Sequence, residues 1–153
     1  MEKNNIESVK KLRSQTGVSI AQCKDALNES SGDYDSAVKI LKSKGAKIAE
    51  AKMHRKTEQG LVDAYIHPNG KVGVIVEVNC ETDFVARNAD FKIFCHEIAL
   101  QIAAMNPENV AKLLKQPYIK DESQIVEQLL HLEISKTGEN IQIKRFDRFE
   151  LGE

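Results

Sequence analysis

The sequence predicts an α+β protein, in which an N-terminal three-helix bundle is linked to a core with a small, mainly antiparallel sheet packed by helices. Three observations support this prediction. The first 45 residues contain three short amphipathic patterns separated by glycines. From Leu61 the pattern changes to β-rich runs around an Asn-Gly turn. Further helical patterns then precede an apolar run near the C-terminus.

Length and composition indicate one globular chain of modest size. The 153 residues are 41% hydrophobic and 29% charged, which is ordinary for a soluble protein. No apolar run approaches the roughly 20 residues that cross a bilayer. Residues 1–5 also lack the apolar centre of a signal peptide. We therefore expect a cytoplasmic protein with no membrane partner.

The sequence contains no pattern typical of a metal, disulfide or catalytic site. The three cysteines include no CxxC pair, and the four histidines share no ligand spacing. There is no phosphate-binding glycine loop and no GxSxG or HExxH motif. Glu77, Glu81 and Asp83 are carboxylates without a partnered base or nucleophile. We expect a binding protein rather than an enzyme, with no metal or cofactor.

Residues 1–45 are expected to form three helices that pack into one bundle, because isolated helices of about ten residues are marginal in water. The spacing of Ser19 and Gln22 predicts a capping box at the start of the second helix. Asp33 can cap the third helix. The glycines expected to end the three helices are Gly17, Gly32 and Gly45.

Two apolar residues, Val18 and Ile20, lie in the turn before the second helix without an obvious core role. They can either be buried in the bundle or form an exposed apolar contact with a partner. The residues alone leave both alternatives open.

Residues 46–59 are expected to link the bundle to the core. Residues 46–52 can be helical, and residues 53–56 are basic and polar. A solvated connector is favoured over an RNA-binding arm, because no aromatic side chain is interleaved there to stack a base. We expect no direct nucleic-acid partner.

The core, residues 60–153, begins with a predicted hairpin whose tip contains Asn69-Gly70. Residues 72–76 are apolar on both faces, which predicts an inner strand covered on each side. A slip in the apolar pattern predicts a bulge or a change of strand partner at Lys144-Arg145. The expected elements are strands at 61–67, 71–80 and 141–151, helices at 89–105 and 125–136, and a short helical turn at 109–114.

The second strand leads directly into a turn that carries apolar residues among charges. Thr82 can cap the helical turn that follows, and Asp83 lies near its positive end or is free to accept from a partner. Phe84 can either plug the core under the hairpin or protrude. A protruding Phe could bury ~150 Å² in a partner and act as a binding hot spot. Both alternatives stay open.

Several segments resemble the elongation factor Ts family. The most specific is residues 74–87, which include Asn79-Cys80-Glu81-Thr82-Asp83-Phe84-Val85-Ala86-Arg87. Residues 9–17, 23–27 and 32–38 resemble the opening of the family, and Gly138-Glu139-Asn140-Ile141 resembles its late strand. The resemblance covers most of the chain. It implies an N-terminal module, residues 1–45, with a fold similar to ubiquitin-associated domains.

The resemblance implies a guanine nucleotide exchange factor in translation elongation. Family members bind elongation factor Tu with GDP, promote GDP release and also bind the nucleotide-free form. The Asp-Phe pair inserts between helices of the GTPase domain near its magnesium site, and the N-terminal module grips the same domain. The partner contacts implied for this chain are Thr82, Asp83, Phe84 and Val85, together with Val18, Ser19, Ile20 and Ala21.

The chain departs from the family at residues 107–116, where family members usually carry a longer helical region. Longer members also have a second half-core and a coiled-coil protrusion, which this sequence lacks. It resembles the short class, in which two copies pair through the sheet. The predicted strand at 141–151 is the natural edge for such a homodimer. The alternative function is a non-enzymatic interaction module that uses the three-helix bundle to bind a ubiquitin-like or nascent-chain partner.

Overall fold

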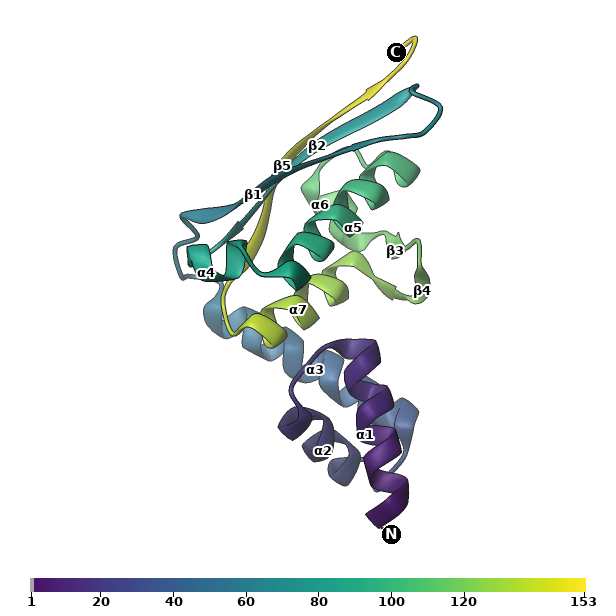
Figure 1. Cartoon of the computed structure of the whole chain (residues 1–153), viewed down its shortest axis with the longest axis vertical. Coiled ribbons are helices and arrows are strands. Elements are labelled where there is room, and N and C mark those ends of the chain that lie inside the picture. Colours follow the sequence, from purple (N-terminus) through teal and green to yellow (C-terminus); the bar gives the residue numbers. More distant parts are fainter. Residues whose placement is uncertain (1) are drawn as a thin grey trace.

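The structure is a computed structural model that describes residues 2–153, with side chains described from residue 6 onward. Met1 and the side chains of residues 2–5 lie outside the described residues. The expected lack of a signal peptide, which depends on these residues, stays a prediction. The described chain is an α+β protein with its helical bundle at the N-terminal end, as predicted (Figure 1). Within residues 2–153, no helix is both long and apolar enough to cross a membrane.

The bundle consists of α1 (Glu2–Thr16), α2 (Ile20–Glu29) and α3 (Tyr34–Lys52). The predicted capping box is confirmed, because the Ser19 hydroxyl accepts from the backbone N–H of Gln22 and the Gln22 side chain accepts from that of Ser19. Asp33 caps α3 through the backbone N–H of Ser36. The bundle core comprises Val9, Leu12, Val18, Cys23, Ala26, Leu27, Ala37 and Leu41, together with Leu132 from the core domain.

The third helix does not end at Gly45, so that prediction is wrong. Helix α3 continues to Lys52 and packs against α7 (Val126–Thr137). A Cβ atom at Gly45 would lie 3.3 Å from the carbonyl oxygen of His131. The glycine therefore permits a close approach of the two helices, and this packing outweighs its low helix propensity. The division into a module at 1–45, a linker at 46–59 and a core at 60–153 stays a prediction.

The main sheet contains β1 (Gln59–Ile66), β2 (Val72–Cys80) and β5 (Ile141–Glu150), all antiparallel, in the order β1-β2-β5. The hairpin and the inner position of β2 are confirmed. The register between β2 and β5 shifts where Glu77 faces Arg145 and Val78 faces Ile143, which leaves Lys144 unpaired. This irregularity confirms the predicted bulge.

Helices cover one face of this sheet (Figure 1). Helix α5 (Ala89–Met105) packs on β1 and β2, and the main core joins Val74, Val76 and Val78 to the apolar side of α5 and to α7. Helix α6 (Val110–Lys115) and a small sheet of β3 (Pro117–Tyr118) and β4 (Asp121–Ile125) connect α5 to α7. The small sheet was not predicted.

The opposite face of the sheet is open, so the expectation that β2 is covered on both sides is wrong. Ile75 in the centre of β2 is 46% exposed, and no helix of the described residues packs over it. The other large apolar side chains exposed on or beside this face are Val62, Ile66, Phe149 and Leu151. A single layer of helices on an antiparallel sheet explains the arrangement.

Candidate partner-binding site

The turn predicted as a partner contact lies at the end of β2, where α4 (Asp83–Ala86) forms a single helical turn (Figure 1). Thr82 is its N-cap, and the Thr82 hydroxyl accepts from the backbone N–H of Val85 at 3.4 Å. The side chains of Asp83 and Arg87 form an exposed ion pair at 2.7 Å. We refer to residues 82–85 as the Asp-Phe turn.

Phe84 protrudes from this turn, and the alternative that it plugs the core is wrong. Its side chain is 89% exposed, the largest fraction among the exposed large apolar residues described. Its neighbours anchor the turn instead, because Ala86 is buried and Val85 packs against the main core. The turn is therefore held from one side while Phe84 points away from the protein.

The carboxylate of Glu139, on the loop between α7 and β5, binds the start of the Asp-Phe turn. It accepts from the backbone N–H groups of Glu81 at 3.1 Å and Thr82 at 3.0 Å. Its second oxygen accepts from the Thr82 hydroxyl at 2.6 Å. Hydrogen bonds to a charged acceptor are stronger than neutral ones. Glu139 was predicted only as part of a strand segment, and its contact with the turn was not predicted from the sequence.

The same loop is bound from two further directions. The Glu81 carboxylate accepts from the backbone N–H of Asn140 at 2.8 Å and pairs with Arg55 at 3.6 Å. The Asn140 side chain donates to the Arg55 carbonyl at 2.9 Å. Lys52, the last residue of α3, donates to the carbonyl of Gly138 at 2.7 Å. The end of α3, the 138–140 loop and the Asp-Phe turn thus form one connected network.

Cys80 ends β2 directly before this network. Its thiol donates to the Thr82 carbonyl at 3.2 Å. Burial, reinforced by the nearby Glu139 carboxylate, raises the pKa of the Cys80 thiol to about 11. The thiol is therefore protonated at neutral pH and supports the turn as a small buried side chain rather than as a nucleophile.

The second predicted contact segment, residues 18–21, is only partly exposed. Val18 is 1% exposed and belongs to the bundle core, so its side chain offers a partner no surface. Ile20 is 46% exposed, and Ser19 and Ala21 are also exposed. Buried Val18 therefore supports a surface that Ser19, Ile20 and Ala21 present.

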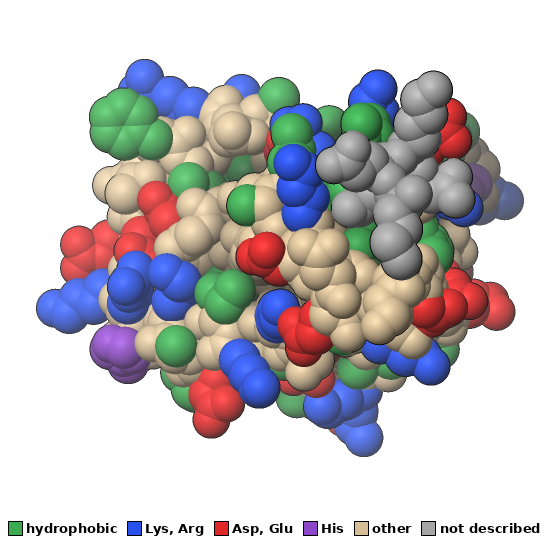
Figure 2. Space-filling view, turned by 90° about the horizontal axis from the view of Figure 1, so that it is seen from below, with side chains coloured by type: hydrophobic (Ala, Val, Ile, Leu, Met, Phe, Trp, Pro, Cys, Tyr) green, Lys and Arg blue, Asp and Glu red, His purple; other side chains and the backbone are tan. Residues whose placement is uncertain are grey.

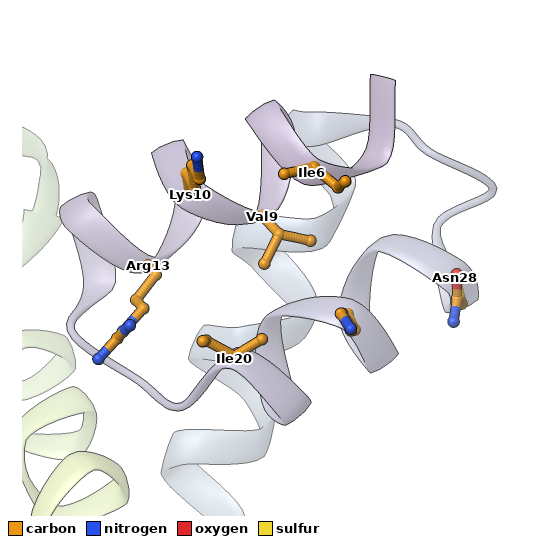
Figure 3. Close-up of a pocket in the computed structure, with 7 residues that line it drawn as sticks. Ile6, Val9, Lys10, Arg13, Ile20 and Asn28 are labelled. Atoms are coloured by element: carbon orange, nitrogen blue, oxygen red, sulfur yellow. The ribbon is translucent and has the colours of Figure 1, made fainter. Parts of the chain in front are cut away.

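Ile20 lies in a groove between α1 and α2 with a volume of about 580 Å³, which we call the α1–α2 groove (Figure 3). Its floor is apolar and its rim is basic. The residues that line it are Ile6, Val9, Lys10, Arg13, Ile20, Lys24 and Asn28. Ile6 is exposed and forms part of the groove.

Charge on the bundle end of the molecule is mixed. Lys and Arg side chains alternate with Asp and Glu over the face seen in Figure 2. Such mixing is not typical of an extended phosphate-binding surface. Among residues 2–153, no group of three or more His, Cys, Asp or Glu residues is arranged to hold a metal ion.

Comparison with known proteins identifies the family. A family model described as Elongation factor TS matches residues 81–153, which contain both Phe84 and Glu139. Elongation factor Ts of Coprothermobacter proteolyticus is 42% identical over 95% of this chain and 96% of its own length. The chain belongs to the elongation factor Ts family. Its relatives from Thermotoga neapolitana and Rubrobacter xylanophilus are 38% and 40% identical, each aligned over at least 95% of both chains.

The alignment with the Coprothermobacter elongation factor Ts extends over 190 positions, although this chain has only 153 residues. Because nearly all of both chains is covered, the relative contains internal residues without a counterpart here. The predicted location of the difference is residues 107–116, where the structure has only the short connection that contains α6.

Glu133 is a buried carboxyl group in α7 of this elongation factor Ts family member. It is 9% exposed, and its Oε1 atom has no hydrogen-bond partner among the described residues. Burial raises its pKa from 4.5 to about 7; Lys136 opposes the rise and Asp90 adds to it. Between these two pH values the folded state binds more protons than the unfolded state. Stability should therefore fall as pH rises through this range, by about 3 kcal/mol in total.

Replacing Glu133 by Gln should remove this pH dependence. The amide has nearly the same size and stays neutral, so we expect Glu133→Gln to stabilise the fold at pH 8 by up to about 3 kcal/mol. At pH 4 the two proteins should differ little. Urea unfolding at both pH values measures the effect, with Glu127→Gln on the same helix as the control. An equal difference between wild type and Glu133→Gln at both pH values would contradict the assignment.

Proposed function

We propose that this chain is a guanine nucleotide exchange factor that binds elongation factor Tu with GDP and promotes GDP release. The observation that supports this most strongly is Phe84, which is 89% exposed on a turn held by buried neighbours and by the Glu139 carboxylate. An exposed Phe on a fixed turn is suited to enter a partner, where it can bury ~150 Å² of apolar surface. Family membership supplies the identity of the partner.

The mechanism we propose is thermodynamic linkage without a chemical step. The Asp-Phe turn enters between helices of the GTPase domain near its magnesium and phosphate site and binds the nucleotide-free conformation better than the GDP-bound one. Because coupling between two ligands is reciprocal, this chain must weaken GDP binding by the same factor by which GDP weakens the binding of this chain. The chain therefore needs no catalytic group and no cofactor of its own, and we propose that it is not an enzyme.

The N-terminal module is proposed to grip the same GTPase domain through the α1–α2 groove. Ser19, Ile20 and Ala21 lie at one end of this groove or beside it, and Ile20 contributes to its floor. The apolar floor with a basic rim suits an amphipathic helix that carries acidic residues. Two separate contacts on one partner would raise the total affinity above that of either contact alone.

Release of fluorescent GDP from purified elongation factor Tu tests the proposal. With this chain at a small fraction of the elongation factor Tu concentration, we expect GDP release to accelerate and to continue over many turnovers. A rate equal to the spontaneous rate, at concentrations where binding is detected, would contradict the exchange function.

The alternative function is an interaction module that binds through the three-helix bundle alone. The α1–α2 groove is the observation that favours it, because the groove does not involve the Asp-Phe turn. The two functions differ in their need for Phe84. Binding without any change in GDP release, and without an effect of Phe84 substitution, would favour the interaction module.

We also propose that two copies pair through the C-terminal strand. Strand β5 lies at the edge of the sheet, so its outer backbone groups are available to a second chain. Of the exposed apolar residues on or beside the open sheet face, Phe149 lies in this edge strand and Leu151 directly follows it, whereas Val62 and Ile66 lie on β1 at the opposite edge. Size-exclusion chromatography with light scattering tests the pairing, and a monomer mass at every concentration would contradict it.

A further inference from the structure

The Glu139 carboxylate contacts the Asp-Phe turn although it lies 57 residues beyond Thr82 in the sequence. We propose that Glu139 is a positioning residue for nucleotide exchange, which fixes the direction in which Phe84 projects. This inference rests on the exchange function proposed above. Glu139 acts through the turn and is not expected to contact the nucleotide.

Helix α4 depends on outside contacts because it is too short to be stable alone. It contains only four residues, and a single helical turn is unfavourable by itself. Its N-cap hydroxyl, on Thr82, donates its one hydrogen to Glu139 and accepts from the backbone N–H of Val85. The carboxylate therefore orients the hydroxyl so that its lone pairs face the helix.

Glu139 is itself held in place, as a positioning residue must be. The next residue, Asn140, is buried and binds Glu81 through its backbone N–H and Arg55 through its side chain. The two loops are thus joined by a reciprocal pair of hydrogen bonds. The Glu139 carboxylate accepts from the backbone N–H of Glu81, and the Glu81 carboxylate accepts from the backbone N–H of Asn140. Two reciprocal contacts restrict sliding of one loop past the other.

The consequence for exchange follows from the exposure of Phe84. A side chain that is 89% exposed has few contacts of its own to fix its direction. If the turn moved among many conformations, only a fraction of molecules would present Phe84 correctly, and the effective strength of insertion would fall by that fraction. The Glu139 contacts keep this fraction high before elongation factor Tu is met.

The first experiment compares Glu139→Ala, Glu139→Gln and the control Glu122→Gln in the GDP-release assay. Glu122 is an exposed carboxylate in β4 and is not part of the network. Glu139→Ala should lower the maximal rate about tenfold or more and change the half-saturating concentration less than about threefold, because the α1–α2 groove is intact. Glu139→Gln keeps one acceptor oxygen and should lie between wild type and Glu139→Ala. Glu122→Gln should match wild type.

The second experiment measures the turn without elongation factor Tu. The chain contains no tryptophan, so Phe84→Trp introduces a single fluorescent reporter. Adding Glu139→Ala should increase the local motion of this reporter, seen in its anisotropy decay. It should also speed hydrogen exchange of the Glu81 and Thr82 amides about tenfold, while the unfolding midpoint shows that the fold is retained.

These measurements separate failure of the inference from failure of the proposed function. Wild type that does not accelerate GDP release would contradict the exchange function, and with it a positioning role in exchange. An active wild type with equally active Glu139→Ala would contradict the positioning role alone. Unchanged amide exchange and reporter motion in Glu139→Ala would show that the carboxylate does not fix the turn.

Discussion

Phe84→Ala is expected to reduce acceleration of GDP release by roughly 30-fold or more while leaving the fold intact. A buried aromatic hot spot contributes at least about 2 kcal/mol to an interface, which corresponds to that factor. The fold should be unaffected because the side chain is 89% exposed, and substitutions at such positions change stability by about 0.5 kcal/mol or less. The measurement is release of fluorescent GDP from elongation factor Tu, together with an unfolding curve for each variant.

The matched control is Ile93→Ala, which removes another exposed apolar side chain from a position in α5 that is 58% exposed. It should behave like wild type in the exchange assay. If Phe84→Ala exchanges GDP normally, insertion of the Asp-Phe turn is not the mechanism. If both variants lose activity equally, the effect reflects general loss of apolar surface rather than this turn.

The sequence predicted the order of the main elements because their patterns are local. The capping box at Ser19, the Asn69-Gly70 hairpin and the helical pattern at 89–105 each depend on neighbours within a few residues. The length of α3 was not predicted, because it depends on packing of Gly45 against His131 in a distant helix. Tertiary contacts outweighed a local stop signal there.

The candidate site was also predicted only in part, because some of its features are local in the sequence and others depend on tertiary contacts. The residues of the Asp-Phe turn were identified from the sequence, but the exposure of Phe84 was not decided. Exposure depends on which neighbours fill the core, and here Val85 and Ala86 do so. Glu139 was missed as a site residue because its contact exists only when β2 and β5 pair and bring the two loops together. No spacing in the sequence reports such a contact.

The second large effect is expected for Gly60→Ala, which should destabilise the fold by roughly 3–5 kcal/mol through a clash and a strained backbone. Gly60 has a φ angle of +147° and pairs with Asn79 of β2. A Cβ atom there would lie 2.1 Å from the Val78 carbonyl oxygen, and backbone atoms cannot move aside as a flexible side chain can. Urea unfolding followed by circular dichroism measures the loss.

Gly70→Ala is the control that separates the clash from the strain. Gly70 has a φ angle of +70° at the hairpin tip, and nothing lies within 4 Å of the added Cβ atom. It should cost only about 1 kcal/mol, the usual penalty for a left-handed alanine. Similar losses for the two variants would contradict the role assigned to close packing at Gly60. A larger loss for Gly60→Ala would mean that β2 requires a close approach of β1 at Gly60. The residue paired with Gly60 is Asn79, which lies only three residues before Thr82, so this close approach also supports the strand that leads into the Asp-Phe turn.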